Sequence, residues 1–140
     1  MGLFNFPKSG KNENIKTVSN SIGEFKYLII NGERQYKGKV KSTIAINYEI
    51  NVTFPLIDEN ISTYQIDYFR RIENNWISIL NQLSIKKPDT DFRDYKVLDV
   101  FIPDKGNESY DKDAEIVLEK EGYLVSLVMK DLDIDEIIEC

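Results

Sequence analysis

The carboxylates near the C-terminus are the residues whose spacing could support chemistry. Asp131, Asp133 and Asp135 alternate, and Glu136 follows them. Three alternating aspartates resemble the start of a calcium-binding EF-hand loop. Such a loop requires glycine at its sixth position, where this chain has Glu136, and a bidentate glutamate at its twelfth, which falls beyond Cys140. We therefore interpret the run as a solvated acidic surface and not as a calcium site.

The chain contains no histidine. This composition excludes Ser-His-Asp and Cys-His catalytic sites, and zinc sites that use histidine. Neither glycine-rich phosphate motif, GxGxxG or GxxxxGK[ST], is present. Two carboxylates could still pair as in glycosidases, but no motif frames any two of the 24 acidic residues in that way. We therefore predict a protein that is not an enzyme and that has no catalytic residue, cofactor or metal ion.

Charge is distributed unevenly along the chain. Residues 1–70 contain nine Lys and Arg against seven Asp and Glu, whereas residues 71–140 contain nine against seventeen. A phosphate backbone attracts positive surface, so nucleic acid is not the expected partner. An acidic surface either binds a basic protein or keeps the chain soluble. For the first alternative, the candidate partner-binding residues are the clustered acids Asp131, Asp133, Asp135 and Glu136.

The expected compartment is the cytoplasm. Cys140 is the only cysteine, so the chain cannot form an internal disulfide. No apolar run approaches the roughly 18 residues that a membrane span needs. The first residues lack the basic and apolar regions of a secretory signal. We therefore predict no membrane association, and the oligomeric state stays open.

The first strong structural signal is Asn31-Gly32, which follows the β-rich run 24–30. Asn-Gly is typical of a type I′ hairpin turn, because both central residues of that turn need positive φ. We therefore predict a hairpin whose second strand starts near Arg34.

Residues 36–54 alternate between apolar and polar side chains. This period of two indicates strands with one face toward a core and one toward water. Nineteen residues exceed the length of one ordinary strand. We therefore predict a reversal or bulge near Ile46-Asn47, and an end at Pro55.

Residues 62–84 are predicted to form one long amphipathic helix. Ser62 and Gln65 have the spacing of a capping box, which satisfies backbone donors in the first helical turn. Apolar residues then recur at the spacing of one helical face. The side chains expected to face the sheet include Phe69, Ile72, Trp76 and Leu80. Trp76 is interpreted as a core residue, although a partner-binding role is the alternative.

Further strands are expected over 96–102, 115–119 and 123–129, followed by an acidic tail with a short helical turn at its end. The predicted fold class is α+β: an antiparallel sheet in β-β-β-α-β-β-β order, with one long amphipathic helix packed on one face. Residues 1–22 are predicted to be a flexible or loosely docked leader, and residues 23–140 a single domain.

Several short segments carry a resemblance to a known group of proteins. The segments are Gly23-Glu24-Phe25, Tyr36-Lys37-Gly38-Lys39-Val40, Ile50-Asn51-Val52-Thr53-Phe54 and Ile61-Ser62, with a helix ending near Leu83. The pattern resembles small acidic bacterial domains of unknown function, some of which are placed among immunity-type proteins of toxin systems. The resemblance covers about residues 23–130 and implies no catalytic residue.

Two functional hypotheses follow. The first is a non-catalytic, acidic protein-binding module, of which an immunity-type protein that sequesters a basic toxin is the specific form we expect. The alternative is an accessory or structural domain of a phage or mobile element with no toxin partner.

Overall fold

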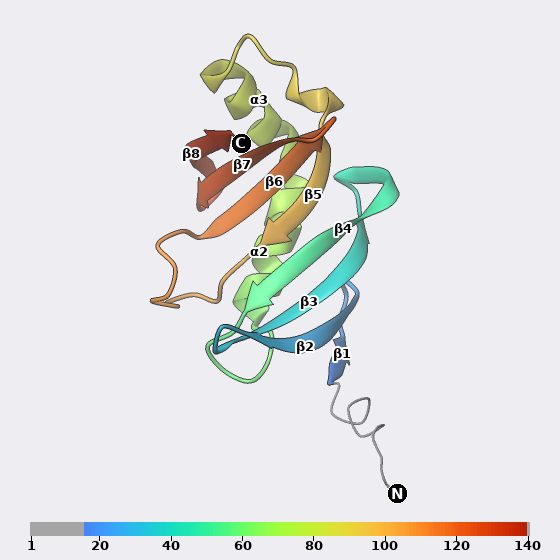
Figure 1. The fold of residues 1–140 in the computed structure, drawn as a ribbon, viewed down its shortest axis with the longest axis vertical. Helices are drawn as coiled ribbons and strands as arrows, with labels where there is room; N and C mark the ends of the chain where they lie inside the picture. Colours follow the sequence, from blue (N-terminus) through green and yellow to red (C-terminus); the bar gives the residue numbers. More distant parts are fainter. Residues whose placement is uncertain (1–15, 140) are drawn as a thin grey trace, which may run out of the picture.

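Short turns connect most of the strands, so neighbours in the sequence become neighbours in the sheet. The computed structural model describes residues 16–139. Its eight strands lie in one sheet in the order β1-β2-β3-β4-β5-β6-β7-β8 (Figure 1). The strands are β1 (Thr17–Ser19), β2 (Glu24–Ile30), β3 (Glu33–Ser42), β4 (Ala45–Pro55), β5 (Lys96–Phe101), β6 (Ala114–Lys120), β7 (Tyr123–Lys130) and β8 (Asp133–Glu139).

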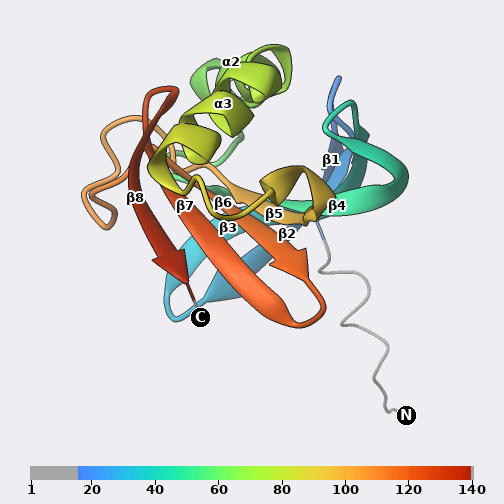
Figure 2. The same ribbon diagram turned by 90° about the horizontal axis from the view of Figure 1, so that it is seen from above.

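Two helices and a short 3-10 helix connect β4 to β5. They are α2 (Thr63–Asn74), α3 (Trp76–Lys86) and η1 (Phe92–Asp94). Both α-helices lie on the same face of the sheet, which curves around them (Figures 1 and 2). The other face of the sheet, toward the viewer in Figure 1, carries no helix within residues 16–139.

One pair of strands breaks the antiparallel pattern. β4 and β5 are parallel, through Asn51–Asp99, Val52–Val100 and Thr53–Phe101. All the other neighbouring strands of residues 16–139 pair antiparallel. The described chain therefore contains two antiparallel four-stranded meanders, β1–β4 and β5–β8, which meet at a parallel seam between β4 and β5.

The predicted fold class was wrong. The sheet is mixed and not antiparallel, and the order of elements is β-β-β-β-α-α-β-β-β-β, with two helices in place of one. The physical reason lies in the crossover: the helices carry the chain back along one face, so β5 starts at the same end as β4. The parallel pairing of β4 with β5 cannot be predicted from a local sequence pattern, because the two strands are far apart in the chain.

β1 falls within the leader that was predicted for residues 1–22. Most of that prediction concerns residues 1–15, which lie outside the described residues. Of the remainder, Thr17–Ser19 pairs with β2 and Ile22 is buried. These residues therefore pack against the strands of the first meander.

The predicted hairpin at Asn31-Gly32 is confirmed. Asn31 has φ 53° and Gly32 has φ 82°, and the turn joins β2 to β3 with Ile30 opposite Glu33. Positive φ at both residues is the requirement of a type I′ turn. The chemistry of two residues was therefore enough to place this turn.

The next reversal lies earlier than predicted. The chain turns at residues 43–44, and an irregularity in the β3–β4 register together with Asn47 at φ 70° follows it. Ile46 is 78% exposed, although period two assigned it to the core face. A slip of one residue moves a strand side chain to the opposite face, and the irregularity here has that effect.

The predicted cap of α2 is confirmed. The Gln65 N–H donates to Ser62 Oγ at 3.1 Å, and the Ser62 N–H donates to Gln65 Oε1 at 2.9 Å. The single helix over 62–84 was wrong, because Asn75 leaves helical geometry at φ −116° and ψ 17°. Its Nδ2 donates to the Arg71 carbonyl at 2.8 Å, so an asparagine side chain competes with the backbone where the helix breaks.

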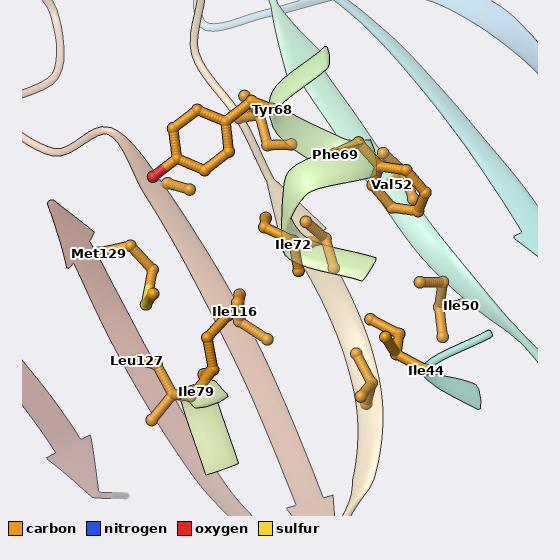
Figure 3. Packing of buried hydrophobic residues seen from close by; sticks show 14 of the residues in the cluster. Ile44, Ile50, Val52, Tyr68, Phe69, Ile72, Ile79, Ile116, Leu127 and Met129 are labelled. Carbon is orange, nitrogen blue, oxygen red and sulfur yellow. The ribbon is translucent and has the colours of Figure 1, made fainter. Parts of the chain in front are cut away.

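The core lies between the helices and the sheet. Figure 3 shows Phe69 and Ile72 of α2 and Ile79 of α3 among side chains of β4, β6 and β7. Phe69 and Ile72 are fully buried, as predicted, whereas Trp76 and Leu80 are only half-buried. Trp76 is the first residue of α3, so the break places it at the margin of the apolar face.

Gln65 is the polar exception in this core. Its side chain is 0% exposed, and its Nε2 donates to the carbonyls of Pro55 at 2.7 Å and Ile102 at 2.9 Å. These carbonyls stand at the ends of β4 and β5. The amide therefore satisfies buried backbone acceptors from both sides of the parallel seam.

Candidate functional site

The acidic tail forms β8, an edge strand, and not a helical turn. β8 has seven residues, pairs antiparallel with β7 and is the last strand of the sheet. Within residues 16–139, no strand lies against its outer edge. Gln82 of α3 already bonds the Leu132 carbonyl and the Ile134 N–H at the start of this edge. The outward backbone N–H and C=O groups after Ile134 can pair with another chain.

The carboxylates of the tail gather along this edge. We call them the acidic edge: Asp131 in the β7–β8 turn, and Asp133, Asp135, Glu136 and Glu139 on β8. All five residues are exposed. The structure thus brings the four residues predicted from the sequence to one border of the sheet and adds Glu139 to them.

Asp131 is held by the protein itself. Its Oδ1 lies 2.8 Å from Nη2 of Arg71, and its backbone N–H donates to Asp113 Oδ2 at 2.6 Å. Its carbonyl accepts a hydrogen bond from the Tyr68 hydroxyl. Burial raises the pKa of Tyr68, and the charges of Asp113 and Asp131 raise it further, so the hydroxyl keeps the proton that it donates. Asp131 therefore anchors the turn to α2.

The other carboxylates of the acidic edge differ in their partners. Within residues 16–139, Asp133, Asp135 and Glu136 form no ion pair, whereas Glu139 Oε2 lies 2.7 Å from Lys87 Nζ. The first three carboxylates are therefore the ones whose charge is open to a partner.

β8 has two different sides. Ile134 pairs with Met129 and is buried, and Ile137 pairs with Leu127 and is half-buried, so these side chains point toward the helices. Glu136 pairs with Val128 and is exposed on the opposite side. A strand added at this edge would meet apolar side chains on one side and carboxylates on the other.

A pocket lies beside the loop that follows β5. It has a volume of about 510 Å³, and charged residues of both signs line it. Two of its carboxylates are already bonded: Asp104 Oδ1 accepts from Ser62 Oγ at 2.7 Å, and Asp113 Oδ2 accepts from the Asp131 N–H. These two bonds hold the loop between β5 and β6 against the start of α2 and the β7–β8 turn.

An apolar groove of about 280 Å³ lies beside the break between α2 and α3. Its apolar lining is Ile44, Ile46, Tyr48, Trp76, Leu80, Phe92, Tyr95 and Val97. Arg93 is paired with Asp91 and holds the pKa of that carboxyl at about 2 through its hydrogen bonds. Lys96 Nζ lies 5.4 Å from the Tyr48 ring centroid, a cation–π contact. Asp94 pairs with Lys120 at 3.6 Å, and Lys96 is the lining charge without an ion pair in residues 16–139.

Residues 16–139 contain no group of three or more Cys, Asp or Glu side chains arranged to hold a metal ion. No helix in the same part of the chain has the length and apolar character needed to cross a bilayer. No family model, curated protein or solved structure matches this chain.

Reasoning from the sequence found the acidic residues but missed the strand that carries them. Ile134 and Ile137 between the acids are the signal that was available, because they supply the apolar side of a strand. Asp131 at φ 53° supplies the turn, a conformation that aspartate tolerates better than most residues.

Proposed function

We propose that this chain is a non-catalytic protein-binding module that receives a basic, extended segment of a protein partner along the acidic edge. The observation that carries the proposal is the combination found in β8. An outer edge without a strand partner in residues 16–139 coincides with three exposed carboxylates that form no ion pair there.

The binding mode that fits this edge is addition of a strand. In that mode the main-chain hydrogen bonds supply affinity and the side chains of alternate residues supply specificity. Lysine or arginine of the partner would pair with Asp135 and Glu136, while an apolar side chain would extend the surface beside Ile137. Long-range attraction by the carboxylates would also raise the association rate.

A basic toxin is the partner class that we propose, and the chain would then act in the cytoplasm as an immunity-type protein. The resemblance noted above supports this class of partner, and the acidic edge supports its charge. Sequestration would follow if the added strand included residues that the toxin needs for its activity.

Edge protection is the competing explanation of the same acids. Charged side chains on an edge strand also prevent pairing with other chains. The two explanations differ in one measurable respect: a purely protective edge binds no basic strand, whereas a binding edge does so in a salt-dependent manner.

The test replaces Asp133, Asp135 and Glu136 by Asn, Asn and Gln, and retains Asp131 because it anchors the turn. Binding of a ten-residue peptide of alternating lysine and valine is measured at low and high salt. We expect the native chain to bind at low salt, and the triple variant to bind at least about tenfold more weakly. Equal binding by both would contradict the proposal.

The matched control neutralises Asp58, Glu59 and Asp89, three exposed carboxylates outside β8. This control changes net charge by the same amount and should bind the peptide as the native chain does. On binding, backbone amides of β8 should become protected from hydrogen exchange. Protection confined to other strands would show that the acidic edge is not the binding site.

A further inference from the structure

The face of the sheet opposite the helices carries an ordered pattern of charge. We call it the open face, and its central side chains are Lys37, Lys39 and Lys41 on β3, Asn51 on β4, Asp99 on β5, and Glu115, Val117 and Glu119 on β6. These residues alternate with buried ones such as Val40 and Ile116, which face the helices. Figure 1 looks onto this face.

The charged strands lie symmetrically about the parallel seam. β3 lies next to β4 on one side, and β6 lies next to β5 on the other. β3 presents three exposed lysines to the open face, whereas β6 presents two half-buried glutamates. The basic strand and the acidic strand are therefore equally distant from the seam, one in each meander.

The register places these charges at matching positions along the strand direction. Lys37 pairs with Thr53, Thr53 with Phe101, and Phe101 with Glu115, so Lys37 and Glu115 stand in one row across the sheet. Lys39 and Val117 end the next row, through Asn51 and Asp99.

β3 and β6 also run in the same direction. Each is antiparallel to its neighbour at the seam, and β4 and β5 are parallel to each other. Lys41 lies two residues beyond Lys39, and Glu119 lies two residues beyond Val117. These two side chains are therefore at similar positions along the strand direction. Lys37 and Lys41 are four residues apart, and so are Glu115 and Glu119.

A twofold axis has a definite consequence for this pattern. Suppose that the axis lies between the two open faces, above the β4–β5 seam and parallel to the strands. The rotation then places β3 of one copy over β6 of the other. It shifts nothing along the strands, so each row lies over the same row of the second copy. Lys37 then faces Glu115 of the second copy, and Lys41 faces Glu119. The same contacts occur twice, as in any twofold interface.

We propose that the open face binds a second copy of this chain, with the twofold axis along the β4–β5 seam and the β3 lysines against the β6 glutamates. The proposal is independent of the acidic edge, which lies at the border of the sheet. Glu115 also has a partner in its own chain, Lys112, so the contact between copies adds to an existing ion pair. Because the attraction is between charges, the dimer should weaken as salt rises.

The test measures the mass of the full chain by sedimentation equilibrium at low and high salt. Two variants reverse the charges: Lys37→Glu with Lys41→Glu, and Glu115→Lys with Glu119→Lys. We expect a dimer for the native chain at low salt, and a dissociation constant at least about tenfold higher for each variant alone. An equimolar mixture of the two variants should restore the dimer, because each chain then supplies the charge that the other requires.

The control, Lys86→Glu with Lys105→Glu, reverses two exposed charges outside β3 and β6 and should dimerise as the native chain does. Circular dichroism of each variant establishes that it is folded. A native chain that is monomeric at low salt would overturn the proposal. A dimer that neither reversal affects, or a mixture that stays monomeric, would equally show that these strands do not face one another.

Discussion

The two meanders of this sheet contain turns with the same backbone conformation but with different side chains. The first turns from β2 to β3 at Asn31-Gly32, and the second turns from β6 to β7 at Glu121-Gly122. Both turns have positive φ at both residues, 53° and 82° in the first, 52° and 88° in the second. The shared glycine at the second position therefore matters more than the identity of the residue before it.

The meanders differ in charge and in how they end. β3 presents lysines to the open face, whereas β6 and β8 present carboxylates. The first meander ends in β1, a strand of three residues, and the second ends in β8, a strand of seven. A short edge strand offers little to a partner, so the difference places the proposed strand-binding edge in the second meander.

The largest expected effects test whether the two meanders share one core. Phe54 of β4 and Leu127 of β7 are both fully buried. Phe54→Ala should lower the free energy of unfolding by about 3–5 kcal/mol and Leu127→Ala by about 2–5 kcal/mol. Denaturant melts should show a single shifted transition for each variant. Two separate transitions would mean that the meanders fold independently.

The next effect compares the two glutamines that tie helices to the sheet. Gln65 bonds the ends of β4 and β5, whereas Gln82 donates to the Leu132 carbonyl and accepts from the Ile134 N–H. Gln65→Leu removes the side-chain donor of the Ile102 carbonyl, which should cost about 1–3 kcal/mol, whereas the Pro55 carbonyl keeps a hydrogen bond from the Asp104 N–H at 3.1 Å. Gln82→Leu should cost less, because Gln82 is only half-buried. Chemical denaturation of both variants measures the difference, and an equal loss would refute this ranking.

The turn glycines Gly32 and Gly122 should show a smaller loss of stability, and the loss should be the same in both meanders. A Cβ at Gly32 or Gly122 meets nothing within 4 Å, so any penalty comes from the backbone conformation alone. Gly32→Val and Gly122→Val should each cost about 1–2 kcal/mol. Asn is tolerated better at positive φ, so the two Asn variants serve as controls. Clearly unequal losses for the two valine variants would show that the turns are not equivalent.

The smallest expected effect concerns Asp99 at the seam. Burial raises the pKa of Asp99 above its ordinary 3.8, although the charge of Lys37 opposes the shift. The pKa of Asp99 is therefore higher in the folded chain than in the unfolded chain, so ionisation of Asp99 destabilises the fold. The free energy of unfolding should fall as pH rises from the unfolded-state pKa to the folded-state pKa. Asp99→Asn should therefore raise the melting temperature at neutral pH but not below pH of about 3.8.

Melts at high salt keep the proposed dimer out of this comparison. The exposed Asp133 provides the control, because Asp133→Asn should change the melting temperature little at either pH. A gain for Asp99→Asn that persisted in acid would assign the effect to something other than its charge.

Local patterns were sufficient wherever a few adjacent residues decide the geometry. The Asn31-Gly32 turn and the Ser62–Gln65 cap were predicted correctly, because positive φ and unsatisfied helix donors restrict the residues that can serve there. The break at Asn75 was missed, since the apolar stripe continues across it. The place of Ile46 was also missed, because a bulge reverses the parity of a strand without changing its composition.

The candidate site shows the same division. The positions of charged residues in the sequence placed the negative charge in the second half of the chain and identified the cluster Asp131, Asp133, Asp135 and Glu136. Pairing with β7 made that segment an edge strand and tied Asp131 to Arg71, and the parallel seam set the β3 lysines level with the β6 glutamates. Turns and caps depend on sterics and hydrogen bonds within a few residues, whereas strand order and register depend on burying surfaces contributed by distant segments, which no short stretch of residues encodes.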